Sequence, residues 1–219
     1  HTAYRRQRQM CIRDRDSAAM QTAKVLAPCE GDTVIDMCAA PGGKTTHIAE
    51  LMNNKGKIYA FDVHEHKIEL IKKNAKRLGI TIIEPKLSDG CKIDESMINT
   101  ADKILCDVPC SGLGIIGRKP EIKWNRAEDN DLPKIQRQIL DNASKYLKIT
   151  GEIVYSTCTI EKEENETVRF EDINLYTHSL SNALVDIALR GHQMTVTNAH
   201  LLANDLSTGG CYPCLLYTC

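Results

Sequence analysis

The stretch that most constrains the fold is residues 36–45, Asp-Met-Cys-Ala-Ala-Pro-Gly-Gly-Lys-Thr. It follows the apolar, β-branched run Thr33-Val34-Ile35 and leads into a helical pattern that continues to Met52. A strand, a glycine-rich turn and a helix in this order begin the nucleotide site of doubly wound α/β folds. Gly42 and Gly43 would let the backbone come close to a ligand, which the N–H groups of the helix start would face. The stretch therefore predicts a ligand site, with glycines needed only for geometry as the alternative.

Two neighbouring features refine this prediction. The turn is not a P-loop, because Ala39 and Ala40 stand where the upstream Walker glycine belongs. Asp62 follows roughly 20 residues later, at the end of the next predicted strand, where a ribose-binding carboxylate is expected. The turn and Asp62 together favour a nucleotide-containing ligand.

Strand and helix patterns alternate from residue 33 to residue 156. We predict a first helix beginning near Ser17, strands over 33–37, 57–61, 80–83, 103–106 and 152–156, and helices over 44–52, 65–78 and 133–147. Five strands alternating with helices predict an α/β fold with a doubly wound, mostly parallel sheet and right-handed crossovers. The rhythm is lost after residue 168, where we expect a helical patch over 183–189 and a strand over 194–197.

Composition limits the class of protein. A chain of 219 residues suits one domain. Its 28 basic and 29 acidic residues nearly cancel, so no overall basic excess indicates nucleic-acid binding, although a local basic groove is compatible with this balance. It contains no apolar run of about 18 residues that could span a membrane and no secretory signal. Its ten cysteines favour a reduced, cytoplasmic protein with working or buried thiols. Cys211 and Cys214 have metal-ligand spacing, but no second pair supports a metal site, so none is expected.

Two further cysteines follow predicted strands. Cys110 stands in Asp107-Val-Pro-Cys-Ser-Gly, after the fourth strand, and Cys158 stands in Tyr155-Ser-Thr-Cys-Thr, at the end of the fifth. Ligands bind at the carboxyl ends of the strands in open parallel sheets, so both thiols should face the crevice of the glycine turn. A small buried residue at a strand end is the alternative for one cysteine. Two beside a cofactor-type turn favour a catalytic role.

Residues 36–45, 107–112 and 155–166 resemble the three signature motifs of the RsmB/Sun (NOL/NSUN) family of RNA cytosine-5 methyltransferases. The likeness extends to Lys119-Pro-Glu-Ile-Lys-Trp and Glu163-Glu-Asn-Glu, and it is nearest to bacterial members that methylate small-subunit ribosomal RNA. Three motifs in order are highly specific. The resemblance implies a Rossmann-like class I methyltransferase domain over residues 16–168. Residues 1–15 would be a disordered or non-native leader, and residues 169–219 a poorly matching tail.

The resemblance also implies roles for single residues. Asp62 would bind the ribose of S-adenosylmethionine, Asp89 its adenine end, and Asp107 would lie between the methyl donor and the target base. Cys158 would be the nucleophile, and Cys110 would be needed to release the product. The partner would be RNA, specifically small-subunit ribosomal RNA, and the protein a cytoplasmic monomer. The residues that would wrap the cofactor are Cys38, Ala39, Ala40, Pro41, Gly42, Gly43 and Lys44.

The chemistry of the reaction explains why these residue types are required. Carbon 5 of cytosine is a poor nucleophile, and a thiolate that adds to carbon 6 pushes electron density onto it. A second group must then remove the carbon 5 proton so that the thiolate can leave. The attacking thiol needs a lowered pKa, and the target base must be single-stranded or flipped out.

Two parts of the family pattern are not matched. Family members carry an N-terminal RNA-binding helical domain, and they end in two further strands with a Gly-Phe-Phe-like motif. Loss of those strands would expose a sheet edge, so we expect a catalytic domain truncated at its start and chimeric at its end. One alternative is a nucleotide- or RNA-binding fragment without a competent fold. The other is a DNA cytosine methyltransferase, in which the Pro-Cys cysteine attacks.

Overall fold

The computed structural model describes residues 17–117, 119–124, 131–165, 168, 184–189, 192–198 and 214–218. The expectation for residues 1–15 therefore lies outside the described residues, as does Cys211. Four helices are described: α2 (Ser17–Leu26), α3 (Gly43–Leu51), α4 (Glu65–Leu78) and α5 (Leu132–Tyr146). Three short 3-10 helices are η1 (Glu95–Met97), η2 (Leu113–Ile115) and η3 (Pro120–Lys123).

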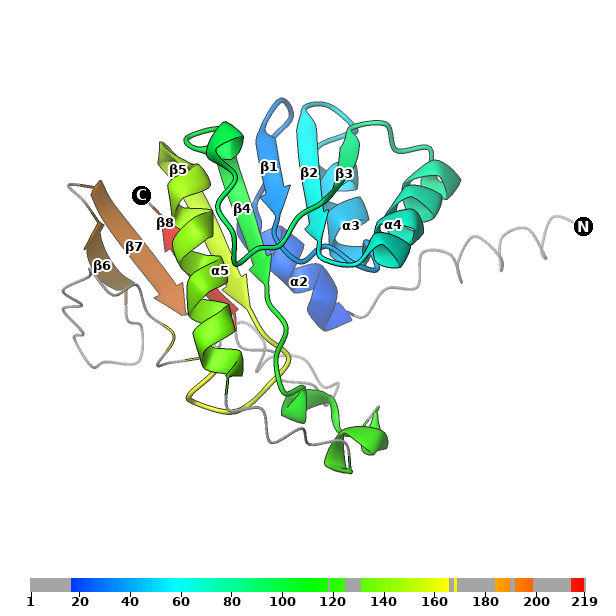
Figure 1. Ribbon diagram of the computed structural model, residues 1–219. Helices are drawn as coiled ribbons and strands as arrows, with labels where there is room; N and C mark the ends of the chain where they lie inside the picture. Colours follow the sequence, from blue (N-terminus) through cyan, green and yellow to red (C-terminus); the bar gives the residue numbers. More distant parts are fainter. Residues whose placement is uncertain are drawn as a thin grey trace, which may run out of the picture.

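The strands of the described residues form one sheet in the order β3-β2-β1-β4-β5-β8-β7-β6 (Figure 1). The first five are parallel, and the last three join antiparallel, so the predicted doubly wound, mostly parallel sheet is confirmed. The strands are β1 (Thr33–Asp36), β2 (Lys57–Asp62), β3 (Ile83–Leu87), β4 (Ala101–Asp107), β5 (Leu147–Ser156), β6 (Leu184–Leu189), β7 (His192–Asn198) and β8 (Cys214–Thr218).

The strand order places the crevice of the fold. The chain runs from β1 outward through β2 and β3, and then returns to add β4 on the other side of β1. The order therefore reverses between β1 and β4, and ligands bind at such a switch point, at the carboxyl ends of the strands. These ends lie at the bottom of Figure 1.

Helices cover both faces of the parallel sheet. Successive residues of β4 point to opposite faces: Ile104 and Cys106 pack in the cluster that includes Ile139 and Tyr146 of α5, whereas Leu105 packs in the cluster that includes residues of α2 and α3. Strands buried on both faces read as continuous apolar runs, which explains why the strand pattern was visible in the sequence. Figure 1 shows α5 in front of the sheet and α2 and α3 behind it.

Two predicted elements were wrong. The third strand covers Ile83–Leu87 rather than residues 80–83, because β3 is an edge strand that pairs only with β2 and so tolerates Pro85. The helical patch over 183–189 is instead β6, which pairs antiparallel with β7, so strand pairing overrode the local pattern. The strand predicted over 194–197 is confirmed within β7.

The expected open edge beside β5 is paired. Strand β8 lies antiparallel to β5 from Glu152 opposite Thr218 to Ser156 opposite Cys214. The backbone groups that an unpaired β5 would present to other chains are therefore used within the sheet.

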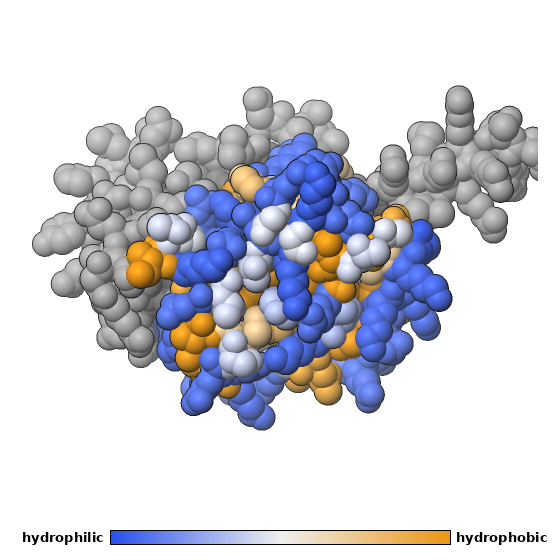
Figure 2. Space-filling view, turned by 90° about the horizontal axis from the view of Figure 1, so that it is seen from above, coloured by the Kyte–Doolittle hydropathy of each residue, from blue (hydrophilic) through white to orange (hydrophobic). Residues whose placement is uncertain are grey.

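The end of the fold at which the parallel strands begin is mainly hydrophilic, with apolar residues scattered in small groups (Figure 2). Among the described helices, none is long and apolar enough to cross a membrane.

Candidate functional site

The turn after β1 is held between the neighbouring strands. The Met37 N–H donates to Leu105 O of β4 at 2.9 Å, and the Ala39 N–H donates to Phe61 O of β2 at 2.8 Å. Gly42 caps the start of α3 with φ 95°, a left-handed conformation that L side chains rarely adopt. A Cβ at Gly42 would lie 3.5 Å from Ile71, on the protein side of the turn. Gly42 is therefore required by the backbone of the turn.

A cavity of about 400 Å³ opens at the carboxyl ends of β1 to β4. It brings together five residues singled out from the sequence: Cys38, Ala40, Asp62, Asp89 and Asp107. The remaining residues of the predicted cofactor turn, Ala39, Pro41, Gly42, Gly43 and Lys44, are not among those that line it. The other lining residues are Met37, Val63, His64, Lys67, Ser88, Gly90, Cys91, Val108, Pro109, Ile135 and Ile139.

Two carboxylates of the cavity are oriented by the chain that follows them. Asp62 is 7% exposed, and its Oδ1 accepts the His64 N–H at 3.0 Å. Asp89 Oδ1 accepts the Cys91 N–H, also at 3.0 Å. In each case an aspartate bonds the backbone two residues on, which is a local turn that fixes the side chain. The shared spacing was a signal for His64 and Cys91 that the sequence reading missed.

Residues of α5 were missed for a different reason. Ile135 and Ile139 line the cavity although they lie more than twenty residues after Asp107 in the sequence. The sequence shows them only as members of an amphipathic helix. Their place at the cavity follows from the packing of α5 on the sheet, so no local signal could have found them.

Asp107, at the end of β4, is held by two donors. Its Oδ2 accepts the Lys44 ammonium at 2.5 Å, and its Oδ1 accepts the Ser156 hydroxyl at 2.8 Å. Lys44 lies in the first turn of α3, directly after the glycine turn, and Ser156 ends β5. Asp107 therefore lines the cavity and also contacts the segment after the glycine turn and the last residue of β5.

The two predicted thiols are in contact. Cys110 Sγ lies 3.0 Å from Cys158 Sγ, and the Cys158 N–H donates to Cys110 Sγ at 3.2 Å. Their strands are neighbours, with Asp107 opposite Ser156. The loops are also joined by a hydroxyl–hydroxyl bond of 2.6 Å between Ser111 and Thr159. The structure thus places both cysteines at one point beside the cavity.

The contact separates the pKa values of the two thiols. The hydrogen bond with Cys110 lowers the pKa of Cys158, against the opposing effect of burial. The same hydrogen bond, together with burial, raises the pKa of Cys110. The contact therefore favours Cys158 over Cys110 as the thiol that ionises, and the thiolate is the nucleophilic form of cysteine.

The other buried cysteines behave differently. Burial is the main cause that raises the pKa of Cys38, Cys91 and Cys106. These thiols remain protonated and act as small apolar residues. The cysteines with described side chains are all free.

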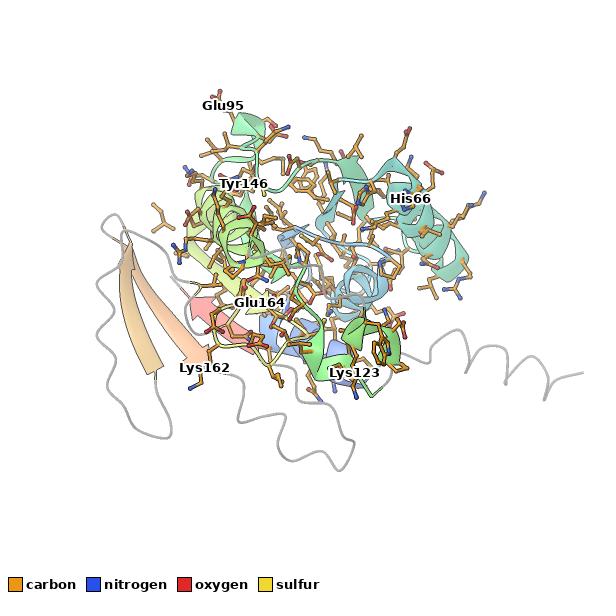
Figure 3. All side chains as sticks on the ribbon, turned by 60° about the horizontal axis from the view of Figure 1, so that its bottom comes forward. His66, Glu95, Lys123, Tyr146, Lys162 and Glu164 are labelled. Carbon is orange, nitrogen blue, oxygen red and sulfur yellow. The ribbon has the colours of Figure 1, made fainter. Side chains whose placement is uncertain are left out.

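The segment 119–124 approaches the thiols through η3. Gly112 has φ 72°, and a Cβ there would lie 3.1 Å from Ile122 Cδ1 and 3.9 Å from Cys158 Sγ. Gly112 therefore lets η3 pack against the Cys110 turn. Lys123, labelled in Figure 3, lies at the rim of this end of the fold.

The sheet order, the glycine turn after β1 and the acidic residues at the ends of β2 and β3 define the Rossmann-like class I methyltransferase fold. A family model described as 16S rRNA methyltransferase RsmB/F matches residues 23–206. The chain belongs to this family.

Three known proteins illustrate the similarity. The chain is 47% identical over 156 residues to the probable ribosomal RNA small subunit methyltransferase B of Bacillus subtilis, covering 70% of this chain and 35% of the relative. It is 44% identical over 154 residues to the tRNA (cytosine(72)-C(5))-methyltransferase of Pyrococcus horikoshii, covering 68% and 38%. The crystal structure of NSun6 from Pyrococcus horikoshii with SFG superposes with a TM-score of 0.68 at 33% identity, covering 93% and 51%. The chain thus spans little more than a third of these curated relatives' length.

Proposed function

We propose that this chain methylates carbon 5 of a cytosine in RNA, with S-adenosylmethionine as methyl donor and Cys158 forming a temporary covalent bond to the base. The proposed substrate is small-subunit ribosomal RNA. One observation carries the proposal: the Cys158 Sγ lies 3.0 Å from the Cys110 Sγ beside a cavity lined by Asp62, Asp89 and Asp107.

The residues of the cavity fit S-adenosylmethionine. Asp62 and Asp89 offer carboxylate oxygens to the ribose hydroxyls and to the adenine amino group. Val63, Val108 and Ile135 supply apolar contacts for a flat base. The volume of about 400 Å³ lies within the usual range of small-molecule sites. When bound, the cofactor would supply an electrophilic methyl group on a sulfonium.

Cys158 would begin the reaction. Its Sγ would bond to carbon 6 of the cytosine, and the electron pair of the 5,6 double bond would move toward carbon 5 and make that atom nucleophilic enough to accept a methyl group. Asp107, which lines the cavity and accepts the Ser156 hydroxyl, would face ring nitrogen 3 of the cytosine and stabilise the charge that develops on the ring.

Cys110 would end the reaction. Before attack, the Cys158 thiolate raises the pKa of Cys110 through their hydrogen bond and through charge repulsion. These two causes disappear once Cys158 Sγ is bonded to carbon, whereas the effect of burial remains. The pKa of Cys110 would therefore fall after attack, so that Cys110 could lose its proton to solvent and act as a base. It then removes the proton from carbon 5, the 5,6 double bond re-forms, and the bond between carbon 6 and Cys158 Sγ breaks.

This division of labour weighs against the DNA cytosine methyltransferase alternative. Attack by the Pro-Cys cysteine would need a thiolate at Cys110, whose pKa is raised rather than lowered. The names of the relatives point to RNA, although to two kinds, ribosomal RNA and transfer RNA. Both RNAs therefore belong in the test.

A gel of protein–RNA adducts tests the proposal. Unaltered protein, Cys158→Ser, Cys110→Ser and the exposed-site control Cys29→Ser are incubated with S-adenosylmethionine and either RNA. We expect Cys158→Ser to give no adduct and no product, because a serine hydroxyl is too weakly acidic to replace the thiolate. Cys110→Ser should accumulate an adduct that survives denaturing electrophoresis, and Cys29→Ser should match unaltered protein.

Other patterns on this gel would overturn the proposal. Adduct in Cys158→Ser but not in Cys110→Ser would reverse the roles of the two thiols. Absence of adduct and of methylated cytosine in every lane would leave a binding fragment as the better interpretation. Mapping the methylated base in the product separates ribosomal from transfer RNA as substrate.

A further inference from the structure

One turn of the chain touches both thiol loops. After β5, the Asn165 N–H donates to Lys162 O at 3.1 Å and closes a turn that contains two buried polar side chains. Glu164 is 4% exposed, and Asn165 is 8% exposed. Figure 3 shows Glu164 turned into the fold, whereas Lys162 of the same turn points away from it. Burial of a carboxylate and an amide is costly unless both are hydrogen-bonded, so their partners matter.

Glu164 holds the loop of Cys110. Its Oε2 accepts the Ser111 N–H at 2.9 Å and the Gln136 Nε2–H at 2.8 Å. Gln136, fully buried on α5, also donates from Nε2 to Pro109 O at 2.9 Å. The residues on both sides of Cys110 are therefore fixed, one directly by Glu164 and one through Gln136.

Asn165 holds the loop of Cys158 in the same manner. Its Oδ1 accepts the Thr157 hydroxyl at 2.5 Å, and its Nδ2 donates to Thr159 O at 3.2 Å. Nδ2 also donates to Glu161 O at 2.8 Å. The residues on both sides of Cys158 are therefore fixed by one side chain.

The two side chains are adjacent in the sequence, so a single rigid turn spans the two loops. The turn is itself anchored to β5, because the Tyr155 hydroxyl donates to Glu164 O at 2.9 Å. The sulfur–sulfur contact of 3.0 Å lies between the two braced loops. We therefore expect that replacing Glu164 or Asn165 would change the distance between the two sulfur atoms more than it would change the sheet.

We propose that Glu164 and Asn165 are positioning residues, Glu164 for Cys110 and Asn165 for Cys158, and that together they set the distance between the two thiols. The assignment of steps to these residues rests on the proposed function. Glu164 would then act on product release and Asn165 on attack, although neither touches the substrate.

The first test needs no RNA. The rate at which iodoacetamide alkylates Cys158 is measured against pH by mass spectrometry, together with the Tm of each variant. Glu164→Ala and Asn165→Ala should shift the midpoint of this profile upward and slow alkylation at neutral pH several-fold, because the Cys110 donor moves away from the thiolate. Glu164→Gln keeps an acceptor oxygen and should restore the profile, and Glu163→Ala, an exposed change in the same turn, should leave it unchanged.

The second test separates the two residues. With RNA and cofactor, Glu164→Ala should accumulate adduct as Cys110→Ser does, whereas Asn165→Ala should form adduct several-fold more slowly without accumulating it. Gln136→Met removes the hydrogen bond from α5 to Pro109 O and should also accumulate adduct. This variant therefore keeps the test available if Glu164→Ala does not fold. Identical adduct behaviour of the Glu164 and Asn165 variants would overturn the assignment of one residue to each thiol.

A purely structural role predicts a different result. The Tm would fall in both alanine variants while the midpoint of alkylation stayed where it is in unaltered protein, and that outcome overturns the proposal. If unaltered protein methylates no RNA and Cys110→Ser forms no adduct, the proposed function fails. The alkylation profiles still decide whether the turn positions the thiols.

Discussion

At the scale of single residues, the site depends on which neighbour each ionisable group meets. Cys106 and Cys158 are the same residue type at the ends of neighbouring strands, yet burial raises the pKa of one and a sulfhydryl donor lowers the pKa of the other. Asp36, buried at the end of β1, shows the same dependence, because burial is the largest cause that raises its pKa.

Asp62 gives the most direct test of cofactor binding. Asp62→Ala removes a carboxylate whose Oδ1 is oriented by the His64 N–H. We expect the affinity for S-adenosylmethionine to fall at least several-fold, because hydrogen bonds to charged groups contribute about 1.5–3 kcal/mol. Isothermal titration calorimetry measures this. Equal affinity of the variant and the unaltered chain would remove Asp62 from the site.

Asp36 should make stability depend on pH. Burial is the largest cause that raises its pKa to about 7, with Asp107 adding to the rise and Thr45 and Lys44 opposing it. Between its ordinary pKa of 3.8 and about 7, the folded state holds a proton that the unfolded chain has released. The free energy of unfolding therefore falls as pH rises through this window.

The variant Asp36→Asn tests this sign. Asparagine stays neutral and has an oxygen that can accept the Thr45 hydroxyl, which now donates to Asp36 Oδ2 at 2.7 Å. Urea denaturation at several pH values should show a flatter profile for Asp36→Asn, so that its stability gains on the unaltered chain as pH rises. Parallel profiles for the two proteins would contradict the raised pKa.

At the scale of elements, the start of α3 decides the shape of the turn after β1. Gly42→Ala forces a side chain into φ 95°, and we expect a loss of about 1–2 kcal/mol in the free energy of unfolding. Gly43→Ala is the matched control, because a Cβ there meets nothing within 4 Å. Denaturant unfolding of both variants measures the difference. Equal losses would mean that the left-handed backbone is not the reason for Gly42.

The element scale also shows what the sequence could predict. Helix α4 was predicted with the bounds Glu65–Leu78 that the structure has, because an apolar stripe and Gly79 mark it locally. The limits of β3 were missed because the tolerance for Pro85 depends on its edge position. Strand β6 was read as helix because its partner β7 is a non-local cause.

The candidate site also has one part that local sequence signals predicted and another that depends on non-local contacts. Cys110, Cys158 and Asp107 were found from strand-end positions and motifs, and the structure brings them together. The contact between the thiols and the bracing by Glu164 and Gln136 could not be predicted from the sequence, because they depend on contacts between residues 27 to 53 positions apart.

At the scale of the whole molecule, charge limits RNA binding. The chain carries a formal net charge of −1, and phosphate contacts supply much of the affinity in nucleic-acid binding. We expect the 219-residue chain to bind ribosomal RNA with a Kd of about 1–100 μM at physiological salt, the range of non-specific binding. Fluorescence anisotropy against salt concentration measures it. Submicromolar binding under these conditions would show that a local basic groove outweighs the net charge.

The ion pair between Lys44 and Asp107 joins two residues that lie 63 positions apart in the sequence. Lys44 lies in the first turn of α3, and Asp107 is the carboxylate proposed to meet the base. A donor molecule that draws Lys44 toward itself would change the field that the incoming base meets at Asp107. Binding of the two substrates would then be coupled, and by reciprocity each would change the affinity for the other by the same factor. That factor would be the same whichever molecule arrives first.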